Sequence, residues 1–375
     1  MAATDLPRSL AAVLRRLGQA LAALLPGLLA TGAAKAVDLP ENKAEALLHV
    51  YDGGGVTATG PAVLVRKNIA DKVSLSATLY VDIVSNASID VVTTASPFRE
   101  TRNALDLGLD YVVRDTAIKF GLSSSREPDY NVSAFSLDAS QEVFGGMTTV
   151  SLGFTRASDK VRKHNAPEFA DAARHWHYRL GATQIISPTW LASLNFEAIS
   201  DSGYLGSPYR VARVFGAAVP ERNPRTRTSR ALKLRASGHL GAGQAVHAEA
   251  RYFWDTWNVR ATTAEAGYSR AFGPAWLADG FLRLHHQSRA LFYSDNASAE
   301  TLYLSRNRQL SSFNTAGVGG KLSHSWRKVP GQYEVKLNGA YEFVHFKYRD
   351  FTDIRTGQLY SFNAHVLQLF VSATY

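Results

Sequence analysis

The sequence predicts an all-β protein: a transmembrane, up-and-down antiparallel β-barrel of about 16 strands, preceded by a cleavable signal peptide. Three observations predict this fold class. Apolar and polar residues alternate through most of the chain after residue 44, and the long connections follow only odd-numbered strands. In addition, hydrophobic residues make up 46% of the chain, while the mean hydropathy is only −0.13. Strands that show one face to lipid and the other to water give this combination.

Residues 1–36 are expected to be the signal peptide, which leaves residues 37–375 for the barrel. Three arginines form the basic part, residues 17–34 are apolar, and Ala34 and Ala36 supply small residues around a cleavable bond. A membrane anchor is the alternative, but Pro26 interrupts the run, which is short for a spanning helix. The segment carries a net charge of +3, so the remaining 339 residues carry only +6 of the total +9.

Strict alternation marks the strands. Every second residue is apolar from Leu75 to Ile83, and again from Val246 to Tyr252. Such segments are half-buried strands, and several exceed the ~5–6 residues of an ordinary soluble strand. We predict sixteen strands, at about 44–51, 56–66, 73–84, 100–113, 115–124, 130–139, 147–157, 173–186, 189–199, 227–240, 243–255, 258–271, 275–288, 312–326, 331–347 and 362–375.

The lengths of the connections between the predicted strands also indicate a membrane barrel. Short turns follow even-numbered strands, at 67–72, 114, 140–146, 187–188, 241–242, 272–274 and 327–330. Long connections follow odd-numbered strands, at 85–99, 158–172, 200–226, 289–311 and 348–361. A soluble sandwich has no reason to separate its loops in this way. A membrane barrel does, with short periplasmic turns and long external loops.

The last predicted strand alternates up to the terminal Tyr375. A chain that ends on a strand with a terminal aromatic residue resembles the signature by which the barrel-assembly machinery recognises bacterial outer-membrane proteins. We therefore expect that machinery and the outer membrane, with its lipid and lipopolysaccharide, to be partners of this chain.

Aromatic residues on the apolar face are predicted to form two girdles, as expected where amphipathic rings meet lipid headgroups. The periplasmic girdle would contain Tyr111, Trp190, Trp276, Trp326, Tyr333 and Tyr375. The external girdle would contain Trp176, Tyr178, Phe196, Tyr252, Trp254, Tyr341 and Phe343.

The polar face of the strands would line the lumen, and it is charged. A predicted basic wall contains Lys233, Arg235, His247, Arg251, Arg283 and His285, and acids on the same face include Asp106, Asp110, Glu249 and Asp279. Such a wall can select for anionic solutes. The alternative is a wet interior in which salt bridges fill space, and the mixture of acids and bases favours this simpler interpretation.

The sequence gives little indication of a metal, cofactor or catalytic site. The chain has no cysteine, which excludes thiolate metal sites and covalently attached c-type haem. His175 and His177 share one strand face, but a metal needs three or four convergent ligands, so we expect no metal or other cofactor. Neither a serine-hydrolase elbow nor a phosphate-binding glycine loop is present.

Basic residues are concentrated in 220–230, which contains Arg222, Arg225, Arg227 and Arg230. This stretch abuts the external end of a predicted strand. Contact with lipopolysaccharide phosphates is therefore the plainer interpretation, and we expect no nucleic-acid partner.

Four stretches carry a family resemblance: residues 41–56, 79–88, 104–140 and 148–159. Together they resemble a bacterial family, domain of unknown function 3570, of predicted outer-membrane barrels. The resemblance is clearest over 41–160. It implies an outer-membrane location and association with extracytoplasmic redox proteins, and it carries no catalytic residues.

We therefore expect a non-enzymatic, integral outer-membrane barrel. The leading hypothesis is a porin-like channel or transporter for small solutes, anionic ones among them. The alternative is a non-conducting barrel or receptor that docks a periplasmic flavin or cytochrome protein. An outer-membrane hydrolase is a third hypothesis.

Overall fold

The computed structural model describes residues 37–86, 88, 98–164 and 166–375. The predicted signal peptide, residues 1–36, lies outside the described residues. No helix in the described part of the chain is long and apolar enough to cross a membrane.

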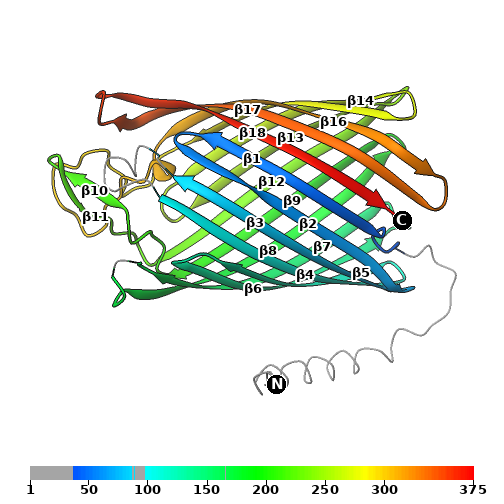
Figure 1. Ribbon diagram of the computed structural model, residues 1–375, viewed down its shortest axis with the longest axis horizontal. Helices are drawn as coiled ribbons and strands as arrows, with labels where there is room; N and C mark the ends of the chain where they lie inside the picture. Colours follow the sequence, from blue (N-terminus) through cyan, green and yellow to red (C-terminus); the bar gives the residue numbers. More distant parts are fainter. Residues whose placement is uncertain (1–36, 87, 89–97, 165) are drawn as a thin grey trace, which may run out of the picture. The chain divides into compact units, whose positions relative to one another are not determined.

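Sixteen antiparallel strands close into one barrel in chain order (Figure 1). They are β1 (Lys43–Gly53), β2 (Val56–Ala70), β3 (Val73–Asn86), β4 (Phe98–Val113), β5 (Thr116–Arg126), β6 (Tyr130–Val143), β7 (Thr148–Arg162), β8 (Ala170–Ser187), β9 (Trp190–Gly203), β12 (Thr226–Gly241), β13 (Gln244–Asp255), β14 (Arg260–Phe272), β15 (Trp276–Gln287), β16 (Phe313–Val329), β17 (Tyr333–Asp353) and β18 (Gln358–Thr374). Each predicted strand corresponds to one of these, so the fold class and the number of strands are confirmed.

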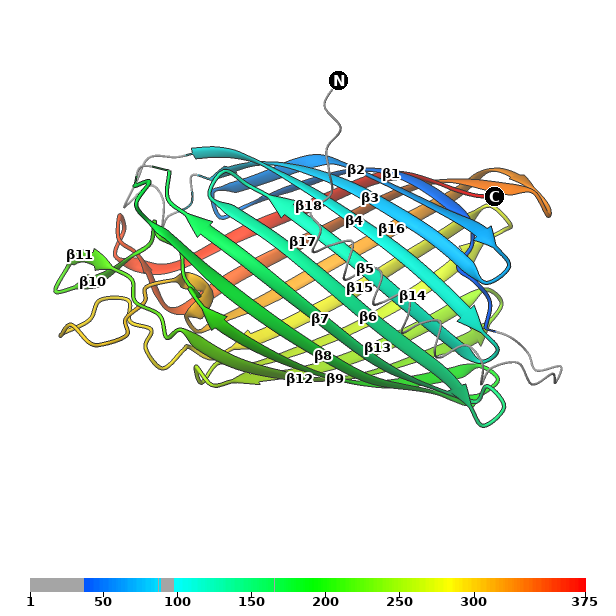
Figure 2. The same cartoon turned by 90° about the horizontal axis from the view of Figure 1, so that it is seen from below.

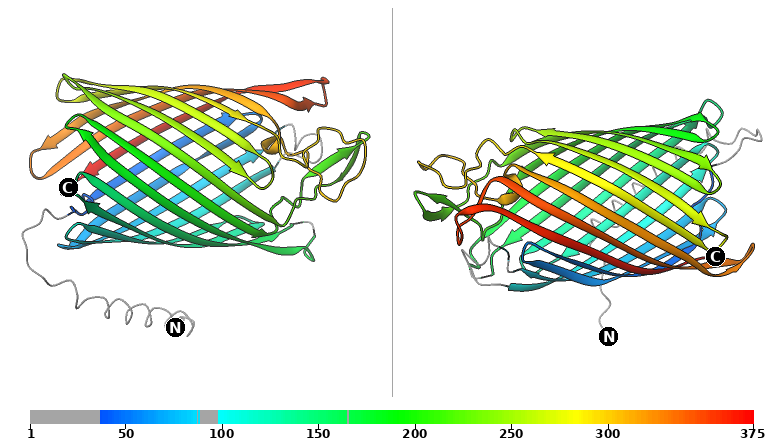
Figure 3. Two further views of the ribbon diagram at one scale, coloured as in Figure 1. Left: turned by 180° about the vertical axis from the view of Figure 1, so that it is seen from behind. Right: turned by 90° about the horizontal axis from the view of Figure 1, so that it is seen from above.

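The barrel closes because the first strand pairs with the last. Lys43 lies opposite Thr374 and Gly53 opposite Ala364. This pairing removes the open sheet edges, whose unpaired backbone groups lipid could not satisfy. The C-terminus lies at the end of the barrel opposite β10 and β11 (Figure 1), and the strands cross the barrel obliquely (Figure 3).

Alternate residues of each strand face opposite sides of the wall. On the outer side, Leu79 lies opposite Leu105, and Leu107 opposite Leu122. These leucines are about half exposed, which is unfavourable in water and favourable in a hydrocarbon layer. Asp106, between two of them in sequence, points to the lumen.

The structure corrects three predicted connections. The predicted loop 348–361 is mostly strand, because β17 and β18 pair up to Asp353 and Gln358. The predicted loop 158–172 is shorter, since β7 continues to Arg162 and β8 begins at Ala170. Beyond the lipid, both faces of a hairpin meet water. Pairing can therefore continue there without the alternation on which the prediction rested.

The third correction lies within 200–226, where β10 (Val211–Val214) and β11 (Ala217–Pro220) form a separate hairpin. Each strand has only four residues, too few for alternation to reveal.

Two loops at one end of the barrel bind each other, and we call residues 204–225 and 288–312 together the mouth cap (Figure 2). Arg222 and Leu304 exchange two backbone hydrogen bonds of 2.9 Å, and the Phe215 N–H donates to the Ala297 carbonyl. The second loop also contains a short 3₁₀ turn, Arg308–Leu310. Long loops are external in barrels of this kind, so the cap marks the external mouth.

The cap has a hydrophobic core of its own. Its buried residues come from the cap, from the turn between β13 and β14, and from β17; they are Trp257, Val259, Ala290, Tyr293, Leu310, Tyr348 and Phe351. Burial of these side chains holds the second cap loop against the barrel rim, as in an ordinary soluble domain.

The outward orientation of β18 can be tested with neighbouring residues. Leu369 is half exposed on the outer face, whereas Gln368 lies opposite the buried, inward-facing His49. Leu369→Arg should lower the free energy of unfolding in lipid vesicles by about 2–4 kcal/mol, because it places a charge near the bilayer midplane. Gln368→Arg serves as the control and should change stability little. Equal losses for the two variants, measured by denaturant titration, would contradict the assigned orientation.

Candidate functional site

Ion pairs cross the inner wall over glycines. Arg179 on β8 and Asp138 on β6 both lie opposite Gly153 of the intervening β7. The Arg179 Nη2 and Asp138 Oδ1 atoms are 2.7 Å apart. A Cβ atom at Gly153 would lie 2.2 Å from Asp138 Oδ1. The glycine therefore leaves the space that this bridge occupies.

A second bridge repeats this arrangement across β16. The Arg283 Nη1 atom of β15 lies 2.7 Å from Glu342 Oε1 of β17. Gly317 lies opposite Arg283, and Gly319 lies opposite Glu342. Glycine in the interior of a strand usually weakens the strand. Here the glycines of β16 leave room for an ion pair between β15 and β17, the strands on either side of it.

The predicted basic wall is assembled on β12 to β15, and carboxylates accompany it. Arg251 Nη2 lies 3.6 Å from Glu197 Oε2, and Arg283 Nε lies 2.8 Å from Glu265 Oε2. The other contacts are Lys233 and Arg235 with Glu249 at 3.5 and 3.4 Å, His247 with Glu265 at 3.2 Å, and His285 with the Thr263 hydroxyl at 2.8 Å. The four Lys and Arg side chains of this wall therefore face four carboxylates, those of Glu197, Glu249, Glu265 and Glu342.

The predicted lumen acids are spread over the wall. Asp106 is exposed on the inner face of β4, while Asp110 is buried, 3.9 Å from the Arg66 guanidinium. Asp279 lies opposite Lys321 in the β15–β16 register, and Glu249 contacts the basic wall. Sequence reasoning missed Glu265, although its position between Thr263 and Gly267 on the inward face of β14 could have revealed it.

A cavity of about 570 Å³ lies between the mouth cap and the inner wall. The wall contributes side chains of β8, β9 and β12–β15, including His175, Arg251, Phe253 and His285. The cap contributes Leu205, Gly206, Ser207, Arg210, Glu221, Asn223, Asn307, Gln309 and Leu310. Because cap and wall line one space, the cap narrows the external mouth of the lumen.

Polar atoms in this cavity are not all satisfied. Arg210 Nη1 and Asn223 Oδ1 are buried and have no hydrogen-bond partner among the described residues. An unpaired buried polar atom is unfavourable unless water or a solute binds it. The cavity lining therefore contains a guanidinium and an amide with unmet hydrogen-bonding capacity, together with the carboxylates of Asp201 and Glu221.

Tyr209 anchors the first cap loop to two neighbouring connections. Its hydroxyl donates to Asp129 in the β5–β6 connection and accepts from the backbone N–H of His164, 2.8 Å away, in the β7–β8 connection. Burial, followed by the hydrogen bond to Asp129, raises the pKa of Tyr209. The hydroxyl thus stays protonated and remains a donor to Asp129.

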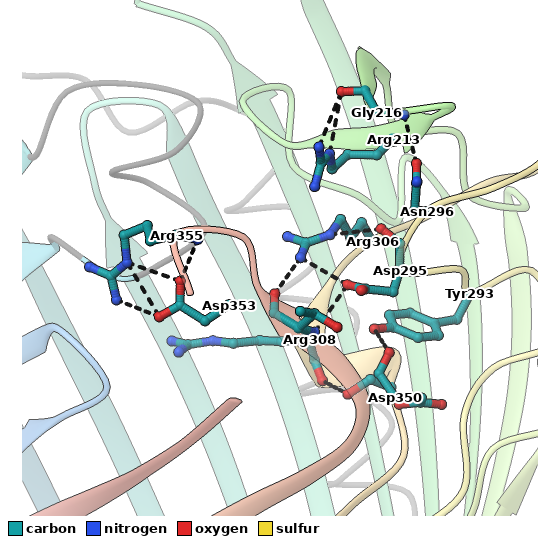
Figure 4. A network of polar contacts seen from close by, with 12 residues as sticks. Arg213, Gly216, Tyr293, Asp295, Asn296, Arg306, Arg308, Asp350, Asp353 and Arg355 are labelled. Atoms are coloured by element: carbon teal, nitrogen blue, oxygen red, sulfur yellow. Dashed lines mark hydrogen bonds and ion pairs between the residues drawn. The ribbon is translucent and has the colours of Figure 1, made fainter. Parts of the chain in front are cut away.

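Polar contacts also hold the second cap loop (Figure 4). Arg306 donates to the Thr352 carbonyl at 2.6 Å and to the Asp295 carbonyl at 2.9 Å. Its guanidinium lies 4.4 Å from the centre of the Phe351 ring. Arg306 is only 6% exposed. Its contacts with Thr352 and Phe351 link the cap to the β17–β18 hairpin, and its contact with Asp295 lies within the cap.

His175 and His177 do share the inward face of β8, but they take different partners. His175 bridges two carboxylates, with Nδ1 2.7 Å from Asp201 and Nε2 2.8 Å from Asp159. The described residues contain no group of three or more His, Asp or Glu side chains arranged to hold a metal ion.

The aromatic residues predicted for the periplasmic girdle lie at strand ends, whereas Tyr178, Phe196 and Tyr341 of the predicted external girdle lie further inside their strands, because these strands extend beyond the predicted girdle. Trp190, Trp276, Trp326 and Tyr375 are 40–66% exposed, and Tyr111 and Tyr333 belong to the same end of the barrel. At the capped end, Trp176 and Tyr178 pack on Phe154, and Tyr252 stacks on Trp254. Phe196 lies opposite Leu180 and Leu232, and Tyr341 and Phe343 both contact His365.

The arginines of 220–230 do not form one external patch. Arg222 pairs with Glu300, Arg225 with Asp171, and Arg227 with the buried Asp255. Only Arg230 lacks a carboxylate partner among the described residues. The predicted basic cluster is thus mostly used to bind the cap and the rim together.

A closed barrel with apolar residues outside, charges inside and a capped mouth is the architecture of an outer-membrane β-barrel protein. A family model described as "Protein of unknown function (DUF3570)" matches residues 88–169 and 162–342. The chain belongs to this family, as the resemblance predicted. No curated protein matches the sequence.

Solved structures share the fold at low sequence identity. A bacterial polysaccharide outer membrane secretin is 8% identical with a TM-score of 0.51, and the match covers 90% of this chain and 99% of that one. The siderophore receptor PirA from Pseudomonas aeruginosa is 11% identical with a TM-score of 0.43, covering 84% of this chain. This chain spans 60% of that receptor. At 8% identity the match to the secretin shows the fold alone, which is that of a bacterial outer-membrane protein.

The role of Gly153 can be tested by adding one methyl group. Gly153→Ala should displace the Arg179–Asp138 bridge and lower stability by about 1–2 kcal/mol, as for other overpacked sites. Gly339→Ala is the control, because a Cβ atom there would meet only Leu369 at 3.6 Å. Denaturant unfolding in vesicles measures both. If Gly153→Ala lowers the free energy of unfolding by the same amount in an Arg179→Gln background, the ion pair does not explain why position 153 requires glycine.

Proposed function

We propose that this protein is a non-enzymatic outer-membrane channel for small polar solutes, with the mouth cap controlling entry. The observation that carries the proposal is the cavity between cap and inner wall, which lies at the external mouth of a closed, charge-lined barrel. By strand count alone, sixteen strands suffice to enclose an aqueous lumen. Residues 1–36 would direct export and then be removed.

The wall supports weak rather than strong charge selectivity. Its bases and acids alternate and neutralise one another, so a passing ion meets little net field. We propose that a preference for anions arises instead at the guanidinium of Arg210, which lines the mouth cavity. Small carboxylate or phosphate solutes would be favoured there because a guanidinium binds both strongly.

Control by the cap can be tested in planar lipid bilayers. Arg306→Ala removes the hydrogen bond to the Thr352 carbonyl that ties the cap to the β17–β18 hairpin, which is worth about 1.5–3 kcal/mol for a charged donor. We therefore expect the fraction of time spent in a high-conductance state to rise about tenfold or more.

Arg213→Ala is the matched control for that experiment. Within the described part of the chain, the Arg213 side chain bonds only the Gly216 carbonyl of its own hairpin, so conductance should stay at the wild-type level. Heat-modifiable migration on gels verifies folding of each variant. A folded Arg306→Ala variant that conducts no better than a silent wild type would refute the proposed channel.

Selectivity gives a separate prediction at Arg283. Arg283→Gln leaves Glu265 and Glu342 without their shared cation, so the lumen gains uncompensated negative charge. The reversal potential in a salt gradient should shift toward cation preference. Lys347→Gln, which removes a charge from the outer face, should leave the reversal potential unchanged. A shift toward anions in Arg283→Gln would contradict the inward placement of this network.

A further inference from the structure

Basic residues collect on the outer face of the barrel at its capped end. We call this set the external basic band; it contains nine exposed residues, Arg99, Arg126, Arg156, Lys160, Arg162, Arg174, Arg230, Arg260 and Lys347. Each occupies an outward position in the strand register, in line with the lipid-facing leucines and aromatics of its strand. On the described strands that carry the band, no outward position is occupied by Asp or Glu. On β17 this holds from Tyr333 to Lys347, after which the register shifts.

The band differs from the lumen in how its charges are satisfied. Inside, Arg179, Arg251 and Arg283 each lie within 3.6 Å of a carboxylate oxygen. Outside, no member of the band has a side-chain hydrogen bond or ion pair within the described ranges of the chain. Exposed cations on a lipid-facing surface need an anionic partner, and residues 37–86, 88, 98–164 and 166–375 supply none for the band.

The band lies at and just beyond the external aromatic girdle. The guanidinium of Arg156 is 4.9 Å from the centre of the Trp176 ring, and Trp176 lies directly opposite it in the register. Girdle aromatics mark the level of the lipid headgroups. The basic residues are therefore at the depth of headgroup phosphates.

One part of the band forms a compact arrangement. Arg230, Trp254 and Arg260 occupy one row across β12, β13 and β14, with the tryptophan between the two arginines. Neighbouring strands are about 4.8 Å apart, so the two arginine backbones lie about 10 Å apart. Both long side chains can reach the same phosphate group or adjacent ones, with the indole against the lipid below.

The opposite end of the barrel carries fewer outward bases. On its described strand residues they are Lys67, Arg270 and Arg327, which lie over the rings of Tyr375, Phe272 and Tyr333 as Arg156 lies over Trp176. The asymmetry points to the leaflet at the capped, external end. In a Gram-negative outer membrane the external leaflet is built of lipopolysaccharide, whose lipid A carries phosphates.

We propose that the external basic band is a binding site for the lipid A phosphates of lipopolysaccharide. Arginine binds phosphate bidentately, and each base near an anionic membrane surface contributes measurably to binding. The site would hold the external rim in its leaflet and fix the height of the capped mouth. It is independent of whether the lumen conducts.

Binding of lipopolysaccharide to the purified full-length protein in neutral detergent tests the proposal. The variant Arg174→Gln/Arg230→Gln/Arg260→Gln should bind about 100-fold more weakly than wild type, at about fivefold per arginine. The control Lys67→Gln/Arg270→Gln/Arg327→Gln removes the same charge from the other end and should bind as wild type does. Heat-modifiable migration confirms that both variants are folded.

Two further ligands identify the chemistry that is recognised. Lipopolysaccharide whose lipid A phosphates have been removed enzymatically should bind wild type as weakly as intact lipopolysaccharide binds the band variant. Phosphatidylglycerol should bind more weakly than intact lipopolysaccharide. The proposal would be overturned if phosphatidylglycerol bound wild type as tightly as intact lipopolysaccharide does. It would also be overturned if both triple variants lost the same affinity for lipopolysaccharide, or if the dephosphorylated glycolipid bound wild type at full affinity. Bilayer conductance of the band variant tests the channel separately, because its lumen residues are unchanged.

Discussion

The structure depends on the pairing of β1 with β18. Lipid offers no hydrogen-bond partners, so a sheet can span it only when its first and last strands satisfy each other. Once the sheet is closed, every strand must show one face to lipid and the other to the enclosed space. The exposed leucines outside and the paired charges inside both follow from this single constraint.

Closure also determines how the interior is stabilised. The barrel has a wide, charged inner surface in place of an apolar core, so its polar groups must be satisfied by one another or by water. Bridges such as Arg179–Asp138 and Arg283–Glu342 reach over an intervening strand, and glycines at 153 and 317 make room for them. The residues that look like a basic wall in the sequence are consequently parts of a nearly neutral network.

The external end combines two different environments. Inside the rim, the mouth cap packs around a small hydrophobic core and encloses a cavity with polar atoms that lack partners. Outside the rim, basic residues face the lipid headgroups with no carboxylate nearby in the described structure. The mouth cap, which we propose controls solute entry, and the external basic band, which we propose binds lipid, thus both lie at the external end of the barrel.

The sequence by itself determined the barrel, its strands and the face of each residue, because lipid imposes period-two alternation that can be counted directly along the chain. It could not determine the cap, since Tyr293, Leu310 and Phe351 meet through long-range packing that no local period encodes. Nor could it show which carboxylate each arginine meets. Arg222 and Arg225 are three residues apart in one loop, yet Arg222 pairs with Glu300 and Arg225 with Asp171. Only the tertiary structure decides this, because charge compensation depends on which side chains lie across a strand in space.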